Sequence, residues 1–353
     1  MHDDMADEVT NRGGEDPRTP EGAPGFAEEV VEAWRGGGFY NPMAVSVDRR
    51  DGSCWVADTY HHQVVHVAAD GKELLRVRGF FYPKSVSANP EDGSCWVADT
   101  DNHQVVHLAA DGQELLRVGG FFCPRSVSAN PEDGSCWVAD SMTHQVVHLA
   151  AKGIELWRGG GCRFPYSVSV SPTDGSCWVA DRKNCQVVRL AAEGAELSRA
   201  GDFFYLRCVS ANLEDGSCWV ADTDNHQVVR LAADGRELWR GGRFRYPHSV
   251  SVDPEDGSCW VADSMNHQVA HLAAEGAELW RGGGFRYPHC VSVNRTDGSC
   301  WVADMFNHQV VRLVSVNKSA RGTHGSHRSS AHRFGPHENA DRHISTGGRE
   351  GGG

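Results

Sequence analysis

The chain has 353 residues, among them 12 cysteines and 11 tryptophans, and its formal net charge at pH 7 is −13. This length suits one large domain with a substantial core. No run of about 18 apolar residues and no apolar export signal is present, which argues against a membrane protein and against an exported one. We therefore expect a cytoplasmic location.

Three regions follow one another along the chain. Residues 1–26 are polar and acidic, and residues 317–353 are rich in Gly, Ser, His and Arg without any periodicity. Both compositions are typical of disordered segments, so we expect disorder at both ends. Residues 27–316 carry a sequence repeat, and we expect them to form the folded domain.

The repeat is marked by the octapeptide Asp-Gly-Ser-Cys-Trp-Val-Ala-Asp, which occurs seven times at a constant spacing of 41 residues. Its tryptophans are Trp55, Trp96, Trp137, Trp178, Trp219, Trp260 and Trp301. A period near 40 with several short apolar runs per unit indicates a repeat architecture.

One repeat contains four short runs rich in Val, Leu, Trp or Ser, at residues 85–89, 92–99, 104–108 and 114–118. Turn sequences such as Asp-Gly and Gly-Gly separate these runs, and such turns supply the positive backbone angles of tight hairpins. Four antiparallel strands per repeat make one blade of a β-propeller. The sequence therefore predicts an all-β fold, a seven-bladed β-propeller of four-stranded antiparallel blades.

The two ends of the repeat region predict how the ring closes. Residues 28–39 closely copy residues 276–285, which form the fourth strand of a repeat, and the last repeat stops after its third strand at residues 309–314. We therefore expect an amino-terminal strand to complete the last blade, which would remove the exposed sheet edges of an open arc.

Seven of the cysteines belong to the octapeptide: Cys54, Cys95, Cys136, Cys177, Cys218, Cys259 and Cys300. Facing sheets pack about 10 Å apart, whereas a disulfide needs Cα atoms closer than about 7 Å. We expect these cysteines to be unpaired, small buried residues beside the tryptophan, as suits a reducing compartment.

Within the repeat, Ser-Val-Ser-Val, the octapeptide and Asn-His-Gln-Val-Val follow in a fixed order, as in Asn102-His103-Gln104 and Asn225-His226-Gln227. This order resembles the NHL repeat over residues 27–316. The resemblance implies a propeller, although NHL propellers often have six blades. It leaves the function open, because members of the family dock partner proteins, bind RNA, act as extracellular sensors or, in one branch, act as metal-dependent lyases.

Two further elements of each repeat are interpreted as structural. The histidine of the Asn-His pair lies at a turn, and blade four has Cys185 in its place, so we expect it to bond the backbone. An aspartate ends each second strand, and a short carboxylate before a turn commonly accepts backbone N–H bonds. These aspartates are Asp58, Asp99, Asp140, Asp181, Asp222, Asp263 and Asp304.

The repeats differ most in the linkers between blades and in the turns between second and third strands. Alternating strand direction puts both segments on one face, the variable face, and leaves near-constant acidic turns on the other. We expect a cationic and aromatic binding surface on the variable face. Its inner residues are Lys84, Arg125, Tyr166, Arg207, His248 and His289, and its surrounding residues are Phe81, Phe122, Phe204, Arg245 and Arg286.

The favoured interpretation is a non-catalytic binding scaffold without a cofactor, whose ligand is a partner protein, a peptide or a small anion. Two alternatives stay open. The elements Tyr246-Pro-His248 and Tyr287-Pro-His289 resemble the Pro-His elements of the peptidyl-hydroxyglycine amidating lyases, which implies zinc at His248 and His289 and a metal-dependent lyase or hydrolase. Single-stranded RNA could stack on the aromatic residues, although the acidic ring opposes phosphate binding.

Overall fold

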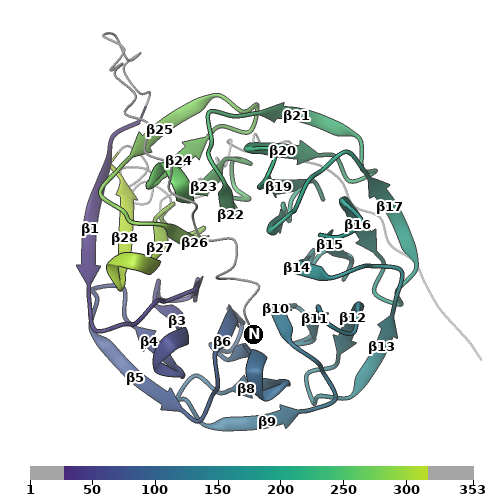
Figure 1. Cartoon of the computed structure of the whole chain (residues 1–353). Helices are drawn as coiled ribbons and strands as arrows, with labels where there is room; N and C mark the ends of the chain where they lie inside the picture. Colours follow the sequence, from purple (N-terminus) through teal and green to yellow (C-terminus); the bar gives the residue numbers. More distant parts are fainter. Residues whose placement is uncertain (1–27, 317–353) are drawn as a thin grey trace, which may run out of the picture.

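A computed structural model describes residues 28–316 of the chain, so the predictions for residues 1–26 and 317–353 lie outside the described residues. Seven four-stranded antiparallel sheets stand around a central channel (Figure 1). This arrangement confirms the predicted seven-bladed propeller. We number the blades 1 to 7 in chain order, with Trp55 in blade 1. No helix among residues 28–316 has the length and apolar character of a membrane span.

The inner strands, which line the channel, are β2 (Ala44–Val47), β6 (Pro83–Ala88), β10 (Pro124–Ala129), β14 (Pro165–Val170), β18 (Cys208–Ala211), β22 (Pro247–Val252) and β26 (Pro288–Val293). The second strands are β3 (Cys54–Asp58), β7 (Cys95–Asp99), β11 (Cys136–Asp140), β15 (Cys177–Asp181), β19 (Cys218–Asp222), β23 (Cys259–Asp263) and β27 (Cys300–Asp304).

The third strands are β4 (Gln63–Val67), β8 (Gln104–Leu108), β12 (Gln145–Leu149), β16 (Gln186–Leu190), β20 (Gln227–Leu231), β24 (Gln268–Leu272) and β28 (Gln309–Ser315). The outer strands are β5 (Glu73–Arg78), β9 (Glu114–Val118), β13 (Glu155–Gly159), β17 (Glu196–Ala200), β21 (Glu237–Gly241), β25 (Glu278–Gly282) and β1 (Val30–Gly36).

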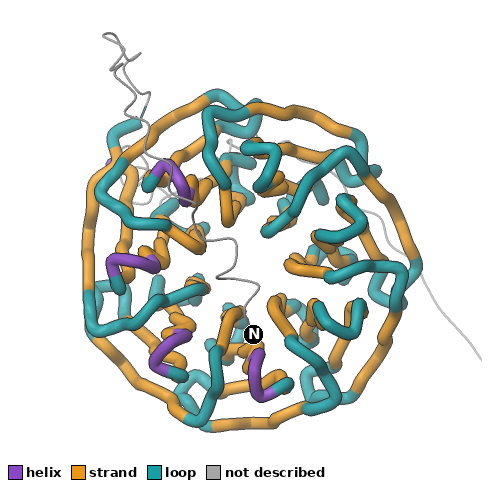
Figure 2. Tube along the Cα trace, in the orientation of Figure 1, coloured by secondary structure: helices purple, strands orange, loops and turns teal. Residues whose placement is uncertain are grey.

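Short 3₁₀ turns connect the second and third strands of some blades (Figure 2). Within the described residues they are η1 (Thr59–His61), η2 (Thr100–Asn102), η3 (Ser264–Asn266) and η4 (Met305–Asn307).

The ring is closed by the amino-terminal strand. β1 pairs antiparallel with β28, which gives blade 7 the strand order β1-β28-β27-β26. Trp34 of β1 also packs against Trp301 of β27, with ring centroids 5.5 Å apart. The predicted closure is therefore confirmed, and the ends of the described chain are held together in one blade.

The core lies between neighbouring blades rather than at the centre of the ring. All seven octapeptide tryptophans are 0% exposed. Trp55 of blade 1, for example, packs with Val86, Cys95 and Val97 of blade 2. All twelve cysteines are unpaired, and the octapeptide cysteines are fully buried, as predicted. Burial raises the pKa of their thiols, so they are neutral packing residues.

Candidate functional sites at the two ends of the channel

The linkers and the turns between second and third strands lie on the same face, as predicted. Backbone hydrogen bonds join them directly: the Asp101 N–H donates to the Phe81 carbonyl at 3.1 Å, and the Phe306 N–H donates to the Arg286 carbonyl at 3.0 Å. The variable face therefore consists of linker residues and 2–3 turn residues in contact with one another.

A buried aspartate fixes each linker of the variable face. In blade 2, Asp99 Oδ1 accepts the backbone N–H of Phe81 at 2.7 Å, and Oδ2 accepts from Asn102 at 2.9 Å and from Arg117 at 3.0 Å. Burial raises the pKa of Asp99, while these hydrogen bonds oppose the rise. The predicted acceptor role is confirmed, and Asp99 fixes the backbone of the exposed Phe81 in the linker that precedes its blade.

The histidine of the Asn-His pair also supports a linker. His103 has a left-handed backbone, with φ of 60°, and its Nδ1 accepts the backbone N–H of Cys123 in the next linker at 3.2 Å. His62, His144, His226, His267 and His308 make the equivalent bond. These residues are structural turn residues, as predicted.

The inner residues of the variable face form a cation–aromatic cluster, made of Arg125, Tyr166, Arg182, Arg207, Tyr246 and His248. At its centre, the buried Arg207 donates to the hydroxyl groups of Tyr166 at 3.1 Å and Tyr246 at 3.2 Å. Arg207 also lies 2.8 Å from Nε2 of His248. The structure thus brings together three predicted site residues, with the half-buried Tyr166 and the buried His248 both bonded to Arg207.

Two more arginines of this cluster lie over tyrosine rings. Arg125 lies 5.2 Å from the ring centroid of Tyr166, and Arg182 lies 4.7 Å from the same ring and 4.1 Å from that of Tyr205. Such contacts stabilise a cation against an aromatic face. Arg182 was not predicted as a site residue, although it occupies a variable position directly after Asp181. Lys84 is half-buried at the start of β6.

The two histidines of the metal alternative are neighbours. The ring centroids of His248 and His289 are 3.9 Å apart, and Nδ1 of His289 lies 2.6 Å from the Met43 carbonyl. Burial, with His289 and Arg207 nearby, holds the pKa of His248 well below its usual range. Arg207 occupies the ring nitrogen that a metal would need, and residues 28–316 offer no group of three His, Cys, Asp or Glu arranged for a metal ion. These side chains do not fit a zinc site.

The surrounding residues of the variable face are exposed to solvent. Phe81, Phe122 and Phe204 are 38%, 49% and 50% exposed, and Arg245 and Arg286 are exposed as well. The backbone N–H of each of these five residues is held by an aspartate at 2.7–2.8 Å. The side chains therefore project from fixed positions, and they form an aromatic and cationic rim around the channel mouth.

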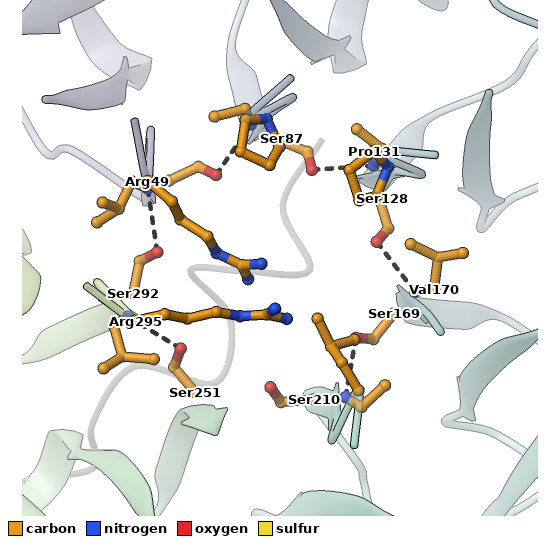
Figure 3. Close-up of a pocket in the computed structure, with 18 of the residues that line it drawn as sticks. Arg49, Ser87, Ser128, Pro131, Ser169, Val170, Ser210, Ser251, Ser292 and Arg295 are labelled. Carbon is orange, nitrogen blue, oxygen red and sulfur yellow. Dashed lines mark hydrogen bonds between the residues drawn. The ribbon is translucent and has the colours of Figure 1, made fainter. Parts of the chain in front are cut away.

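The opposite end of the channel is only partly acidic, which corrects the prediction of an acidic face there. Glu91, Glu132 and Glu214 do line a vestibule of about 420 Å³ there. At its centre, however, Arg49 and Arg295 reach into a cavity of about 130 Å³ (Figure 3). Both arginines follow an inner strand at a position where four other blades have proline. Arginine in place of proline at this position of the repeat was the sequence feature from which these two residues could have been predicted.

The profile of the NHL repeat family matches residues 244–272, which comprise the last linker residues and the first three strands of blade 6. No curated protein matches the chain.

Solved structures of similar shape are propellers with little sequence identity. A streptogramin B lyase structure has a TM-score of 0.70 at 13% identity, covering 81% of this chain and 97% of its own. Hydrazine synthase from Kuenenia stuttgartiensis has a TM-score of 0.70 at 15% identity, covering 79% and 97%. Virginiamycin B lyase from Staphylococcus aureus has a TM-score of 0.69 at 12% identity, covering 81% and 99%. At such identities the likeness concerns the fold alone.

Proposed function

We propose that this seven-bladed β-propeller, whose residues 244–272 match the NHL repeat, is a non-catalytic binding module whose variable face docks an acidic segment of a partner protein. The observation that carries this proposal is the rim of exposed Phe81, Phe122 and Phe204 beside the exposed Arg245 and Arg286. Aromatic and arginine side chains contribute most of the binding energy in protein interfaces.

The charge of the rim argues for an acidic partner. The chain as a whole carries a net charge of −13, so a negatively charged partner is repelled at long range and is attracted only where cations are gathered. Such local complementarity favours one orientation of docking over others. The twelve free thiols suit a reducing compartment, and we place this interaction in the cytoplasm.

The test uses a random-peptide display library panned on the immobilised full chain. We expect enrichment of peptides rich in Asp and Glu with interspersed apolar residues, and weaker binding as salt rises. The double variant Arg245→Glu/Arg286→Glu should bind a selected peptide about tenfold more weakly or worse in calorimetry, because it replaces two cations by two anions.

A matched control keeps the result specific to the variable face. Arg236→Glu reverses an exposed charge in the turn between the third and outer strands of blade 5, on the opposite face, and should leave peptide affinity unchanged. If the selected peptides bind the Arg245→Glu/Arg286→Glu protein as tightly as the original chain, the proposal is wrong.

The metal-dependent alternative has its own readout. Elemental analysis of the purified full chain, beside a His248→Ala/His289→Ala double variant, measures bound zinc directly. Zinc near one equivalent per chain that disappears in the variant would favour the lyase or hydrolase interpretation over a binding module.

A further inference from the structure

A ring of seven serines lines the channel near the end opposite the variable face. The ring consists of Ser46, Ser87, Ser128, Ser169, Ser210, Ser251 and Ser292. Each serine oxygen accepts a backbone N–H from the inner strand of the next blade, at 2.9–3.1 Å. A hydroxyl that accepts still has its own proton to donate, and these seven hydroxyls donate no hydrogen bond to another residue among 28–316. The serine ring therefore offers donors to a guest in the channel.

Arg49 and Arg295 point into the space that the serine ring encloses (Figure 3). In the described part of the chain, neither guanidinium group makes a hydrogen bond or ion pair, and Nε of Arg295 is buried without a partner. Both arginine side chains are half-buried, and a guanidinium group withdrawn from water is usually paired. Two half-buried cations and a ring of hydroxyl donors together leave the cavity with many donors and few acceptors.

The two arginines also repel each other. Burial and the nearby Arg295 lower the pKa of Arg49 to about 9, although Asp253 acts in the opposite direction. Burial lowers the pKa of Arg295 to about 10, again against the effect of Asp253. The folded chain thus holds two charged groups in a place that disfavours their charge, and a bound anion would relieve that cost.

From this donor set we infer that the cavity formed by Arg49, Arg295 and the serine ring binds a phosphate group. The planar guanidinium fork matches phosphate oxygens in a bidentate manner, and a phosphate has enough oxygens to accept from two arginines and several hydroxyls at once. A single water needs about 10–15 Å³ of such space, so a cavity of about 130 Å³ holds one small oxyanion.

The entrance to the cavity restricts what the phosphate can be attached to. Glu91, Glu132 and Glu214 line the vestibule, together with Arg50. Carboxylates at the entrance repel a polyphosphate or a nucleic acid strand and attract a positive group. The chemistry that fits is one phosphate group, free or carried on a small neutral or cationic body.

The repeat itself supplies the matched variant. Leu213 of blade 5 occupies the position equivalent to Arg49 and Arg295, and it lines the same cavity. Arg49→Leu/Arg295→Leu therefore installs a side chain that the fold already accepts at this place. Because it removes two mutually repelling, half-buried cations, the double variant should melt at a higher temperature than the original chain in phosphate-free buffer.

The experiment is a calorimetric titration of the full chain with inorganic phosphate, phosphocholine and tripolyphosphate. We expect saturable binding of one phosphate or one phosphocholine per chain, and binding of tripolyphosphate that is weaker than either. Affinity should fall at least tenfold in Arg49→Leu/Arg295→Leu. A Lys72→Leu/Arg236→Leu control removes two exposed charges from outer turns and should bind as the original chain does.

Three outcomes would overturn the inference. They are the absence of saturable phosphate binding by the full chain, equal binding by the Arg49→Leu/Arg295→Leu protein, and tightest binding of tripolyphosphate. If the leucine variant fails to fold, Arg49→Gln/Arg295→Gln, which keeps polar side chains at both positions, replaces it under the same criteria. The variable face takes no part in this titration, so its outcome is independent of the peptide test.

Discussion

A single position of the third strand decides what covers each buried tryptophan. In blade 2, His107 stacks on Trp96 with ring centroids 4.2 Å apart and planes within 3°, and its Nε2 lies 2.9 Å from Ser94 Oγ. In blade 4 the same position holds Arg189, whose guanidinium lies 5.6 Å from the Trp178 ring. The repeat therefore accepts either a neutral imidazole or a permanent cation at this place.

The histidines make the ring sensitive to mild acid. Burial lowers the pKa of His66, His107 and His148 below the ordinary 6.5. Below pH 6.5 the unfolded chain therefore binds more protons than the folded chain. The contribution of these histidines to the free energy of unfolding is fully present above pH 6.5 and is lost as the pH falls below 6.5. We predict a lower melting temperature at pH 5.5 than at pH 7.5, as measured by circular dichroism.

A variant with arginine in place of His66, His107 and His148 provides the matched comparison. Arg189 shows that its partners exist in the repeat, because it donates to Ser176 Oγ at 3.0 Å and to Asp174 at 2.7 Å. The triple variant His66→Arg/His107→Arg/His148→Arg should lose less stability between pH 7.5 and pH 5.5. An undiminished pH dependence in this variant would show that other groups are responsible.

At the scale of the strands, the aspartate at the end of each second strand connects the blade to its linker. Asp222 accepts from the Phe204 backbone at 2.7 Å, from Asn225 at 2.9 Å and from Arg240 at 3.1 Å. One carboxylate thus holds the linker, the 2–3 turn and the outer strand of blade 5. Its loss would leave three donors without their acceptor.

We predict that Asp222→Ala lowers the free energy of unfolding by about 2–3 kcal/mol, because buried donors without acceptors are costly. Urea unfolding measures the change. Glu193→Ala, at an exposed turn residue of blade 4, is the control and should stay within about 0.5 kcal/mol of the original chain. A loss in Asp222→Ala no larger than that of the control would contradict the structural role of the carboxylate.

The strands were predictable from the repeat, but some of their first residues were not. The second strand of blade 2, expected within the run 92–99, begins at Cys95. Turn residues and apolar runs located four strands per unit, but the inner strand of blade 2 was predicted to begin at residue 85 and begins at Pro83. Proline is compatible with the first position of a strand, since its missing N–H is not needed there. Pro83 pairs with Asp99, and the register shifts between Pro83 and Ser85.

For the whole molecule, closure of the ring through β1 is the decisive contact. Without it, β28 would become an exposed edge, and Trp301 would lose the packing of Trp34. Because blades of nearly equal sequence have nearly equal intrinsic stability, the ring should unfold cooperatively once closure is lost. We predict that a chain without residues 27–36 melts at a clearly lower temperature. Melting of this truncated chain at the same temperature as the full chain would refute the closure model.

The repeat determined which site residues could be predicted from the sequence. The repeat made every variable position recognisable, so the rim residues such as Phe122 and Arg286 could be located on one face. The hydrogen bonds of Arg207 to Tyr166, Tyr246 and His248 could not be predicted. They depend on how side chains of three blades meet across the channel mouth.

The cavity at the opposite end was missed for a related reason. Arg49 and Arg295 belong to blades 1 and 7, which lie at the two ends of the repeat region and become neighbours only when the ring closes. The sequence alone therefore did not show that these two cations share one cavity.

The central claim, docking of an acidic partner on the variable face, is tested most directly by hydrogen–deuterium exchange of the full chain with and without a selected acidic peptide. We predict slower exchange of the linker amides, including those of Phe122, Phe204 and Arg245, and of the neighbouring 2–3 turns. Exchange in the turns of the opposite face should not change. Protection confined to those opposite turns, with the linkers unaffected, would contradict the claim.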